Sequence, residues 1–368
     1  MKAIDAKPIH ILGPLDTSLR ILHVGPMLPG STTVQRFAAL KDLGHQVMEL
    51  NSASEKEFVA KPTLFSRIQR KLLGPQDRAG ANACILQNIQ SKPFDVLWID
   101  KGSTIYPDTL RKVHGIQPRC QIVGFSPDDM MNPANQSRYF LKGLPLYDYF
   151  ITNKSYNVAE LTGLGCPKVL FMDNAYDPNI HRPLSVGDDE RKRLGGKVGF
   201  IGQWEPERAE SLRKIALSGI PVRVWGYTWE RMKNIPPVML LENRPLWGDE
   251  YVRAISSFDI NLCFLRKCNR DLQTTRTMEI PACNAFMLAE RTVEHQRLFF
   301  EGKEAEYFGD DEELLGKVRY YLVHPEERRR IAKGGYDRCL RDGYSNENRL
   351  RAALKIIMAT ELNRKQNL

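Results

Sequence analysis

Basic and hydroxyl side chains gather in the stretch 266–290, where their types and spacing could bind an anion. A threonine-rich loop precedes a helix that we predict to begin at Thr274 or Thr275, where hydroxyl groups can cap free amides. Arg276 and the first amides of this helix would provide a seat for a diphosphate, because guanidinium groups and helix amino termini both bind phosphate oxygens.

Two carboxylates in the same stretch could accept hydrogen bonds from hydroxyl groups. Asp271 lies in the loop and Glu279, eight positions later, lies on the first turns of the predicted helix. Such a pair can hold the hydroxyls of a sugar or a ribose. The alternative is purely structural, since a capped helix with charged surface residues would give the same pattern.

A glycine-containing loop follows the first predicted strand. Its sequence GPMLPGST, residues 25–32, nearly matches the phosphate-binding loop G-x-x-x-x-G-K-[ST], but Ser31 stands in place of the lysine. An NTPase is therefore not supported, and the dinucleotide fingerprint G-x-G-x-x-G is absent as well. Gly30 and Ser31 would lead into a helix whose free amides could face an anion. An ordinary strand-to-helix turn is the alternative.

A third polar loop, residues 125–137, also follows a predicted strand. Asp128 and Asp129 lie there among Ser, Asn, Gln and two prolines. Loops at the carboxyl ends of strands carry chemistry in α/β folds, although Asp, Asn and Ser also form turns and caps. Asp128 is the candidate site residue of this loop. The Asp pair lacks further ligands nearby in sequence, so we predict no metal site.

Short apolar runs alternate with amphipathic stretches, which indicates parallel sheets covered by helices, and hence an α/β class. In the first half the predicted strands are 19–24, 46–50, 94–100, 121–125, 147–152 and 168–172, with a helix at 32–43 and a polar connection after residue 50. A Pro- and Asp-rich segment, 173–190, is a predicted linker. The predicted strands then resume at 197–202, 221–226, 258–264, 285–290 and 305–308, with helices at 206–218, 249–257, 311–323, 325–341 and 346–363.

The composition is that of a globular protein, with 368 residues, 42% of them hydrophobic and 26% charged. This excludes collagen, a coiled coil and a wholly disordered chain. No apolar run approaches the roughly 20 residues of a membrane span, and the start of the chain predicts no secretory signal. Seven cysteines without a Cys-x-x-Cys motif favour a reduced, cytoplasmic protein.

The chain carries a net charge of +9, from 53 Lys and Arg against 44 Asp and Glu. A basic surface without a specific partner, a phosphate-bearing ligand or an anionic membrane face would each account for this excess. Because the nucleic-acid-binding signatures that we sought are absent, we expect no nucleic-acid partner. Peripheral association with the inner membrane face is left open.

Residues 274–292 and 299–340, together with Tyr344, resemble the glycosyltransferase group typified by the spore-coat maturation protein CgeB, within the GT-B superfamily. Segments 126–161 and 175–183 look like the same group, so the resemblance extends from about residue 20 to 360. The C-terminal half of the chain is similar to the C-terminal domain of family-4 glycosyltransferases. The resemblance implies two Rossmann-like, doubly wound domains facing across a cleft, where ligands bind at the carboxyl ends of strands. Its parts would be an extension at 1–18, an acceptor domain at 19–175, a donor domain at 176–345 and a C-terminal helix at 346–368 that packs back towards the N-terminal domain.

The resemblance also implies roles for particular residues. Such enzymes use a Glu-x7-Glu pair, whose positions correspond here to Asp271 and Glu279. Glu279 would hold the ribose hydroxyls and Asp271 the donor sugar. The shorter Asp side chain leaves the choice of sugar open. Asn284 replaces the usual Gly of a turn, and Asn tolerates the left-handed backbone that such a turn needs.

In related enzymes a cation for the diphosphate follows the first strand of the second domain. Arg208 occupies that position here, with Gly202 and Gln203 before it. Trp225 and Gly226, at the end of the next predicted strand, complete the predicted donor-binding residues, which also include Gly30, Ser31, Thr274 and Thr275. A solvated helix residue is the alternative for Arg208.

The implied activity is that of a hexosyltransferase, with Asp128, Asp271 and Arg276 as catalytic residues. It would move a sugar from a nucleotide-diphosphate donor, a UDP- or GDP-sugar in the first place, to a glycan, lipid-linked, small-molecule or protein acceptor. We expect retention at the anomeric carbon and neither metal nor other cofactor. A non-catalytic nucleotide-sugar-binding protein of the same fold is the main alternative. A nucleotide-binding oxidoreductase or an NTPase is disfavoured by the missing motifs.

Overall fold

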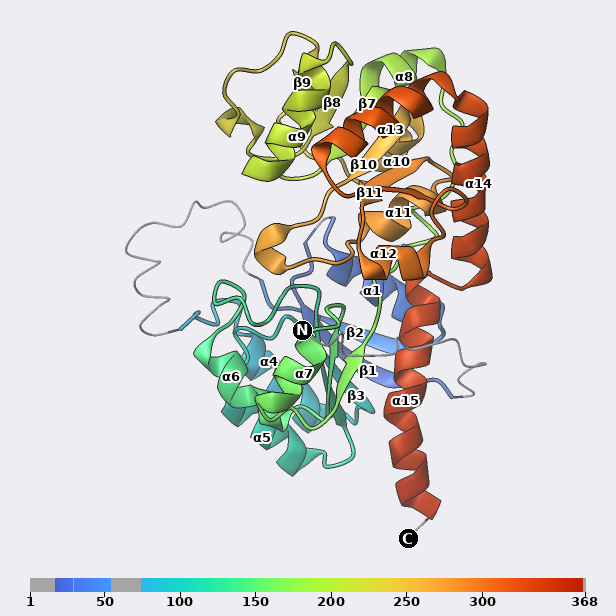
Figure 1. The fold of residues 1–368 in the computed structure, drawn as a ribbon. Coiled ribbons are helices and arrows are strands. Elements are labelled where there is room, and N and C mark those ends of the chain that lie inside the picture. Colours follow the sequence, from blue (N-terminus) through green and yellow to red (C-terminus); the bar gives the residue numbers. More distant parts are fainter. Residues whose placement is uncertain (1–16, 29, 54–73, 367–368) are drawn as a thin grey trace. The chain divides into compact units, whose positions relative to one another are not determined.

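The structure is a computed structural model that describes residues 17–28, 30–53 and 74–366. It contains two α/β units (Figure 1). Unit 1 comprises the described residues up to Asp173 together with those from Asn346 onward, and unit 2 spans Asn174–Ser345. Each unit has one six-stranded parallel sheet with helices against it, which confirms the predicted α/β class.

The sheet of unit 1 has the strand order β2-β1-β3-β4-β5-β6. Its strands are β1 (Arg20–Gly25), β2 (Gln46–Asn51), β3 (Val96–Asp100), β4 (Gln121–Ser126), β5 (Tyr149–Thr152) and β6 (Val169–Phe171). The chain runs from β1 outward to β2 and then returns to the other side of β1 with β3. The loops after β1 and β3 therefore diverge at the switch point of this sheet.

Two apolar layers cover the sheet of unit 1, because successive strand residues point to opposite faces. Leu22 and Val24 pack with α4 (Ala81–Ser91) and α5 (Pro107–Ile116). Ile21 packs on the other face with α1 (Thr32–Asp42) and α15 (Asn346–Gln366). The remaining α-helices described in this unit are α6 (Arg138–Gly143) and α7 (Asn157–Gly163).

The helix α4 corrects the expectation of a polar connection after residue 50. Its buried residues Ala81, Ile85 and Ile89 recur every four positions and form one apolar stripe. Polar residues such as Asn82 and Asn88 between them lower the overall hydropathy of the stretch and obscure this pattern. Residues 54–73 of the same connection lie outside the described residues.

The sheet of unit 2 has the strand order β12-β11-β10-β7-β8-β9. Its strands are β7 (Gly196–Ile201), β8 (Val222–Trp225), β9 (Met239–Leu241), β10 (Phe258–Cys263), β11 (Met287–Glu290) and β12 (Glu306–Phe308). Sequence analysis missed β9, which has three residues and follows two prolines. The helices are α8 (Asp188–Leu194), α9 (Pro206–Leu217), α10 (Gly248–Ser257), α11 (Arg276–Ala282), α12 (Val293–Leu298), α13 (Asp311–Val323) and α14 (Pro325–Arg341).

The segment 173–190, predicted as a linker, contributes buried residues to unit 2. Asp177 and His181 are 5% and 3% exposed, and Tyr176 forms an isolated parallel bridge with Ser345. Aspartate and histidine in a Pro-rich stretch look like linker residues, but here the amide of Asn179 donates to Asp177 at 2.9 Å, and the amide of Asp177 donates to His181 at 3.1 Å. Within the part of the chain that the structure describes, no helix has the length and apolarity needed to cross a membrane.

Candidate functional site

The switch point of unit 2 lies between β7 and β10, which are neighbours in the sheet although β8 and β9 separate them in sequence. Strands β8 and β9 continue on one side and β11 and β12 on the other. Ligands of open α/β sheets bind where the loops diverge in this way. The loop after β7 leads to Arg208 on α9, and the loop after β10 leads to Arg276 on α11.

The side chain of Arg208 is buried, with the residue 2% exposed. Its Nη1 donates to the carbonyl of Gln203 at 3.1 Å, and its Nε donates to the carbonyl of Leu265 at 3.3 Å. Glu205 lies 3.7 Å from the same Nη1, whereas Nη2 has no hydrogen-bond partner among the described residues. Burial, followed by the charge of Arg276, lowers the pKa of Arg208 to about 10. A solvated helix residue would not be buried in this way.

Arg276 converges on the same place from the other loop. It is the first residue of α11 and is half-buried. Both guanidinium groups lie near the ring of Phe200, at 5.7 Å for Arg208 and 5.8 Å for Arg276. The Nε of Arg276 is buried without a hydrogen-bond partner in the described chain. Two cations with open donors therefore face one region, an arrangement that an anion would stabilise.

Close backbone packing supports the loop after β7. Gly202 donates from its amide to the carbonyl of Trp225 at 2.8 Å. Gly226 has a φ of +143°, and a Cβ on it would lie 2.1 Å from the carbonyl oxygen of Gly202. Position 226 therefore requires glycine. This contact fixes the turn after β8 against the loop that leads to Arg208.

Trp225 and Gln203 have structural roles in this loop arrangement. The indole of Trp225 is 2% exposed, and its Nε1 donates to the carbonyl of Leu194 at 3.0 Å. It therefore offers no open donor, and we leave it out of the proposed site. Gln203 contributes its carbonyl to Arg208, and its side chain is exposed.

Glu279 lies on α11, buried, with two partners that sequence analysis missed. The hydroxyl of Tyr251, on α10, donates to its Oε2 at 2.5 Å. The Nε2 of His181 lies 3.7 Å from Oε1. Since the amide of Asp177 donates to Nδ1 of His181, the neutral ring carries its proton on Nε2, towards the carboxylate. Burial and the charge of Glu279 raise the pKa of Tyr251 well above its usual value, so its hydroxyl stays a donor.

Asp271 is folded back onto its own loop. Its Oδ2 accepts from the amide of Arg266 at 3.4 Å, and its amide donates to the Arg266 carbonyl at 3.2 Å. The Nε of Arg266 donates to Glu205 at 2.9 Å, which ties the loop after β10 to the loop after β7. None of the contacts described for Asp271 involves Glu279.

The predicted capping of α11 by Thr274 or Thr275 is wrong. Thr275 stands at the helix start with helical dihedral angles and no side-chain cap. The hydroxyl of Thr277 instead accepts from the amide of Thr274 at 3.0 Å, because a threonine in the first turn can reach back to the preceding amide. The prediction for Asn284 is confirmed, since its φ is +55°.

The candidate residues of unit 1 lie at the carboxyl ends of its strands. Asp128, after β4, forms an ion pair at 3.1 Å with Lys101, which follows the neighbouring strand β3 and has a φ of +66°. Ser31 caps α1, since its hydroxyl oxygen accepts from the amide of Thr33 at 3.1 Å. Gly30 has a φ of +75°. The loop thus has the geometry of an ordinary strand-to-helix turn, which was the structural alternative. Binding of an anion at this loop stays a prediction.

A buried polar network near this edge has no signal in the sequence, because its members come from three separate elements. Asp100 accepts from Nη2 of Arg36 at 2.9 Å and from the indole of Trp98 at 3.0 Å, and His23 lies 3.4 Å away. Desolvation opposes ionisation of this carboxylate, but Arg36 and His23 hold its pKa well below the usual range. The network links β1, β3 and α1.

Comparisons with known proteins identify the fold. Residues 208–355 match the model of a family described as glycosyl transferase-like. HepE from Anabaena, in complex with UDP and glucose, aligns with a TM-score of 0.62 and 11% identity over 93% of this chain and 99% of its own. Sucrose-phosphate synthase from Thermosynechococcus elongatus aligns with a TM-score of 0.60 and 13% identity over 94% and 100%.

An alpha-glucosyltransferase in complex with UDP and a 13-mer DNA containing an HMU base aligns with a TM-score of 0.64 and 13% identity, over 93% of this chain and 100% of that one. A comparison with curated proteins found none that matches. At these identities the likeness shows the fold, and the chain has the GT-B fold of glycosyltransferases. The narrower resemblance to the CgeB group stays a prediction.

Proposed function

We propose that this protein is a glycosyltransferase that binds a nucleotide-diphosphate sugar to unit 2. The observation that carries the proposal is the pair of arginines at the switch point between β7 and β10. Arg208 and Arg276 each keep a buried guanidinium nitrogen without a hydrogen-bond partner among the described residues. Open donors of two cations match the oxygens of a diphosphate.

The same two residues suit the chemistry of sugar transfer. When the bond between the sugar and the diphosphate breaks, negative charge builds up on the leaving oxygen. Positioned guanidinium groups in a partly desolvated site stabilise that charge in the transition state. We therefore assign Arg276 a catalytic role and Arg208 a binding role, and we propose that these cations act without a metal ion.

The nucleoside would be held by Glu279. Its carboxylate is oriented by Tyr251 and His181, and a carboxylate fixed in this way can still accept from the two hydroxyls of a ribose. Asp271 is proposed to contact the donor sugar, and retention at the anomeric carbon follows from the resemblance to Glu-x7-Glu enzymes. Because HepE and the alpha-glucosyltransferase were determined with UDP, we place a UDP-sugar before a GDP-sugar.

The acceptor is proposed to bind unit 1, with Asp128 as its polar or basic contact and Lys101 holding that carboxylate. The first screen should include glycan, lipid-linked, small-molecule and protein acceptors. We propose that the protein acts in the cytoplasm. DNA should be included as well, because the alpha-glucosyltransferase of the same fold was determined with DNA. We expect no transfer to DNA, since the nucleic-acid-binding signatures are absent from this sequence.

The proposal is tested by calorimetry and thermal unfolding with UDP-, GDP- and dTDP-sugars, followed by a donor-hydrolysis assay. We expect one donor to bind and to be hydrolysed slowly. A donor that binds but is not turned over with any acceptor would favour the non-catalytic alternative. The feature of the sequence that favours this alternative is Asp271, which is one methylene shorter than the Glu of the Glu-x7-Glu pair. Absence of binding by every nucleotide sugar would refute the assignment.

Glu279→Gln tests the ribose contact directly. Wild-type protein should prefer UDP to 2′-deoxy-UDP, because the carboxylate accepts from the 2′-hydroxyl, and the variant should lose most of this preference. Tyr251→Phe, which removes the orienting hydroxyl, should have an intermediate effect. Glu326→Gln, at an exposed helix position, is the matched control. Unchanged discrimination in Glu279→Gln would show that the ribose lies elsewhere.

A further inference from the structure

The loop that leads to Arg276 is held by one short stretch of unit 2, residues 290–295 at the end of β11 and the start of α12. We propose that Thr277, on α11, and His295, in this stretch, form a hydrogen-bonded pair that positions Arg276 for binding the diphosphate. The inference rests on the proposed function and extends it, since neither side chain is assigned a contact with the ligand. Both residues are fully buried, at 0% exposed.

A directed chain of hydrogen bonds connects this pair to the loop. The Nδ1 of His295 lies 2.6 Å from the carbonyl oxygen of Glu290, which can only accept, so Nδ1 carries the proton. The unprotonated Nε2 then accepts from the hydroxyl of Thr277 at 2.9 Å. The same hydroxyl oxygen accepts from the amide of Thr274 at 3.0 Å. Each link fixes the direction of the next.

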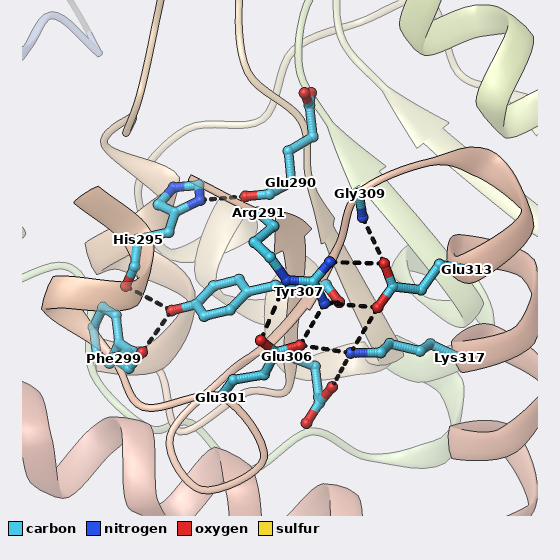
Figure 2. A network of polar contacts seen from close by, with 10 residues as sticks. All are labelled: Glu290, Arg291, His295, Phe299, Glu301, Glu306, Tyr307, Gly309, Glu313 and Lys317. Carbon is cyan, nitrogen blue, oxygen red and sulfur yellow. Dashed lines mark hydrogen bonds and ion pairs between the residues drawn. The ribbon is translucent and has the colours of Figure 1, made fainter. Parts of the chain in front are cut away.

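The imidazole itself is held in place. Its ring stacks on the ring of Tyr307, with centroids 5.8 Å apart and planes 6° apart. The hydroxyl of Tyr307 donates to the backbone carbonyls of His295 and Phe299 at 2.7 and 2.9 Å (Figure 2). Burial lowers the pKa of His295 to about 4, so near neutral pH the ring is uncharged and Nε2 remains an acceptor.

The same stretch holds the loop at three further points. The carboxylate of Glu290 accepts from the amide of Leu265 at 2.8 Å, where the loop begins. The hydroxyl of Thr292 donates to the carbonyl of Leu272 at 2.6 Å. Gln273 donates through Nε2 to the carboxylate of Glu294 at 2.7 Å. One segment of the chain thereby holds the loop near its start, at Leu265, and near its end, at Leu272 and Gln273.

An ion-pair network anchors that segment in turn. Arg291 contacts Glu301 and Glu313, each at 2.6 Å, and also donates to the carbonyl of Tyr307 at 3.1 Å (Figure 2). Lys317 approaches Glu301 at 2.8 Å. These carboxylates raise the pKa of Arg291, so the network stays charged. Because it is partly exposed, we infer that it contributes geometry more than free energy.

The position of Thr277 explains why its hydroxyl would matter for binding. It directly follows Arg276 and precedes Glu279 by two positions on the same helix. Its hydrogen bonds to His295 and to the amide of Thr274 hold the start of α11 on both sides of Arg276. Loss of the hydroxyl would let the guanidinium group move and weaken contacts with the outer phosphate. Contacts with a nucleoside monophosphate would suffer less.

The test compares the affinities for UDP and UMP, measured by calorimetry. Thr277→Val keeps the shape but removes the hydroxyl, and should lower UDP affinity by roughly tenfold with a much smaller change for UMP, as expected when an oriented charge-assisted hydrogen bond is lost. Thr277→Ser restores the hydroxyl and should recover most of the affinity. Thr162→Val, at an exposed helix position in unit 1, is the control.

The two nitrogens of His295 can be tested separately. His295→Gln places a side-chain oxygen near Nε2 and should be the milder change. His295→Asn keeps a donor near Nδ1 but loses the acceptor, and should resemble Thr277→Val. The double variant Thr277→Val/His295→Asn should be no weaker than either single variant, because all three break the same link.

Four outcomes would overturn the inference. Unchanged UDP affinity in Thr277→Val and His295→Asn would remove any positioning role. An equal loss for UDP and UMP would indicate local collapse of the site, and a Thr277→Ser variant as weak as Thr277→Val would exclude the hydroxyl as the cause. If the wild-type protein binds no nucleotide at all, the proposed function fails first, and the inference fails with it.

Discussion

At the residue scale, Arg208 and Arg276 differ from the arginines of an ordinary charged surface, which is why we propose that they bind a ligand. Most arginines in the described parts of the two units form ion pairs, as Arg213 does with Glu210 at 2.9 Å on the surface of α9. Arg208 also pairs with Glu205, at 3.7 Å, but it is buried beside the like charge of Arg276, and burial followed by that charge lowers its pKa. Desolvation and repulsion both disfavour two free cations in this position, which supports the proposal that an anion binds there.

Arg276→Gln should therefore separate stability from binding. In the ligand-free protein the change relieves repulsion with Arg208, so the melting temperature should stay equal or rise. The stabilisation by UDP should fall strongly, since charge-assisted hydrogen bonds contribute about 1.5–3 kcal/mol each. Thermal unfolding with and without UDP checks both effects. Arg213→Ala, with an exposed ion pair, should change the free energy of unfolding by no more than about 0.5 kcal/mol, both with and without UDP. An equal response of the two variants would contradict a binding role for Arg276.

At the element scale, the turns at the ends of neighbouring strands determine where the loops of unit 2 can go. The turn after β8 approaches the loop after β7 so closely that no Cβ fits at position 226. The segment from Glu290 to His295 similarly fixes the loop after β10. Short helices such as α11 and α12 contribute little stability of their own, so apolar packing and tertiary hydrogen bonds hold them in place.

Gly226→Ala should be strongly destabilising, because a Cβ would lie 2.1 Å from the carbonyl oxygen of Gly202 and the φ of +143° disfavours alanine. We expect a loss of more than about 2 kcal/mol, measured by denaturant unfolding. Gly316→Ala is the matched control on α13, where nothing lies within 4 Å of the added methyl group. It should stabilise the helix by about 0.5–1 kcal/mol. Equal effects at the two positions would contradict the close approach.

The buried His295 should make stability depend on pH in a defined window. Its pKa is lowered by burial to about 4, below the unfolded value of 6.5, so the unfolded chain binds the proton more tightly. The free energy of unfolding should fall as the pH decreases from about 6.5 to 4, by at most about 3 kcal/mol at about 1.4 kcal/mol per pKa unit.

His295→Gln should remove this contribution to the pH dependence. Denaturant unfolding of both proteins between pH 7 and pH 4 gives the difference curve, which cancels other groups such as His45, whose pKa burial also lowers. Parallel curves for the two proteins would show that His295 is protonated as readily in the folded state as in the unfolded chain.

At the scale of the whole molecule, the two units have separate apolar cores and separate switch points. The arginines of the proposed diphosphate site account for two of the positive charges, and the rest of the net charge of +9 stays unassigned. The donor residues that we propose all belong to unit 2, whereas Asp128 and Lys101 belong to unit 1.

Binding of UDP should therefore leave a local signature in amide hydrogen exchange. We expect increased protection at residues 202–208 and 265–279, because ordering of these loops by the diphosphate suppresses local opening. The amides of β1 to β6 should change little. Protection concentrated instead in the loop 25–32 would move the nucleotide to unit 1 and contradict the proposed site.

The sequence by itself determined the α/β class, nearly every strand and the long helices, because hydrophobic periodicity is a local property of the chain. Arg276 and Glu279 stand out in the stretch 266–290, whereas Arg208 is chosen through the resemblance to glycosyltransferases. The short strand β9 and the helix α4 escaped because three residues, or a stripe interrupted by asparagines, give too weak a pattern.

Only the tertiary structure decided which side chains support these residues. Tyr251 reaches Glu279 from 28 positions away, Arg266 reaches Glu205 from 61, and Thr277 meets His295 across 18. No local pattern encodes such contacts, because parallel sheet topology, and not sequence distance, brings the ends of β7, β10 and β11 together. The same packing buried Arg208 and moved Trp225 into a core, which the order of residues alone could not distinguish.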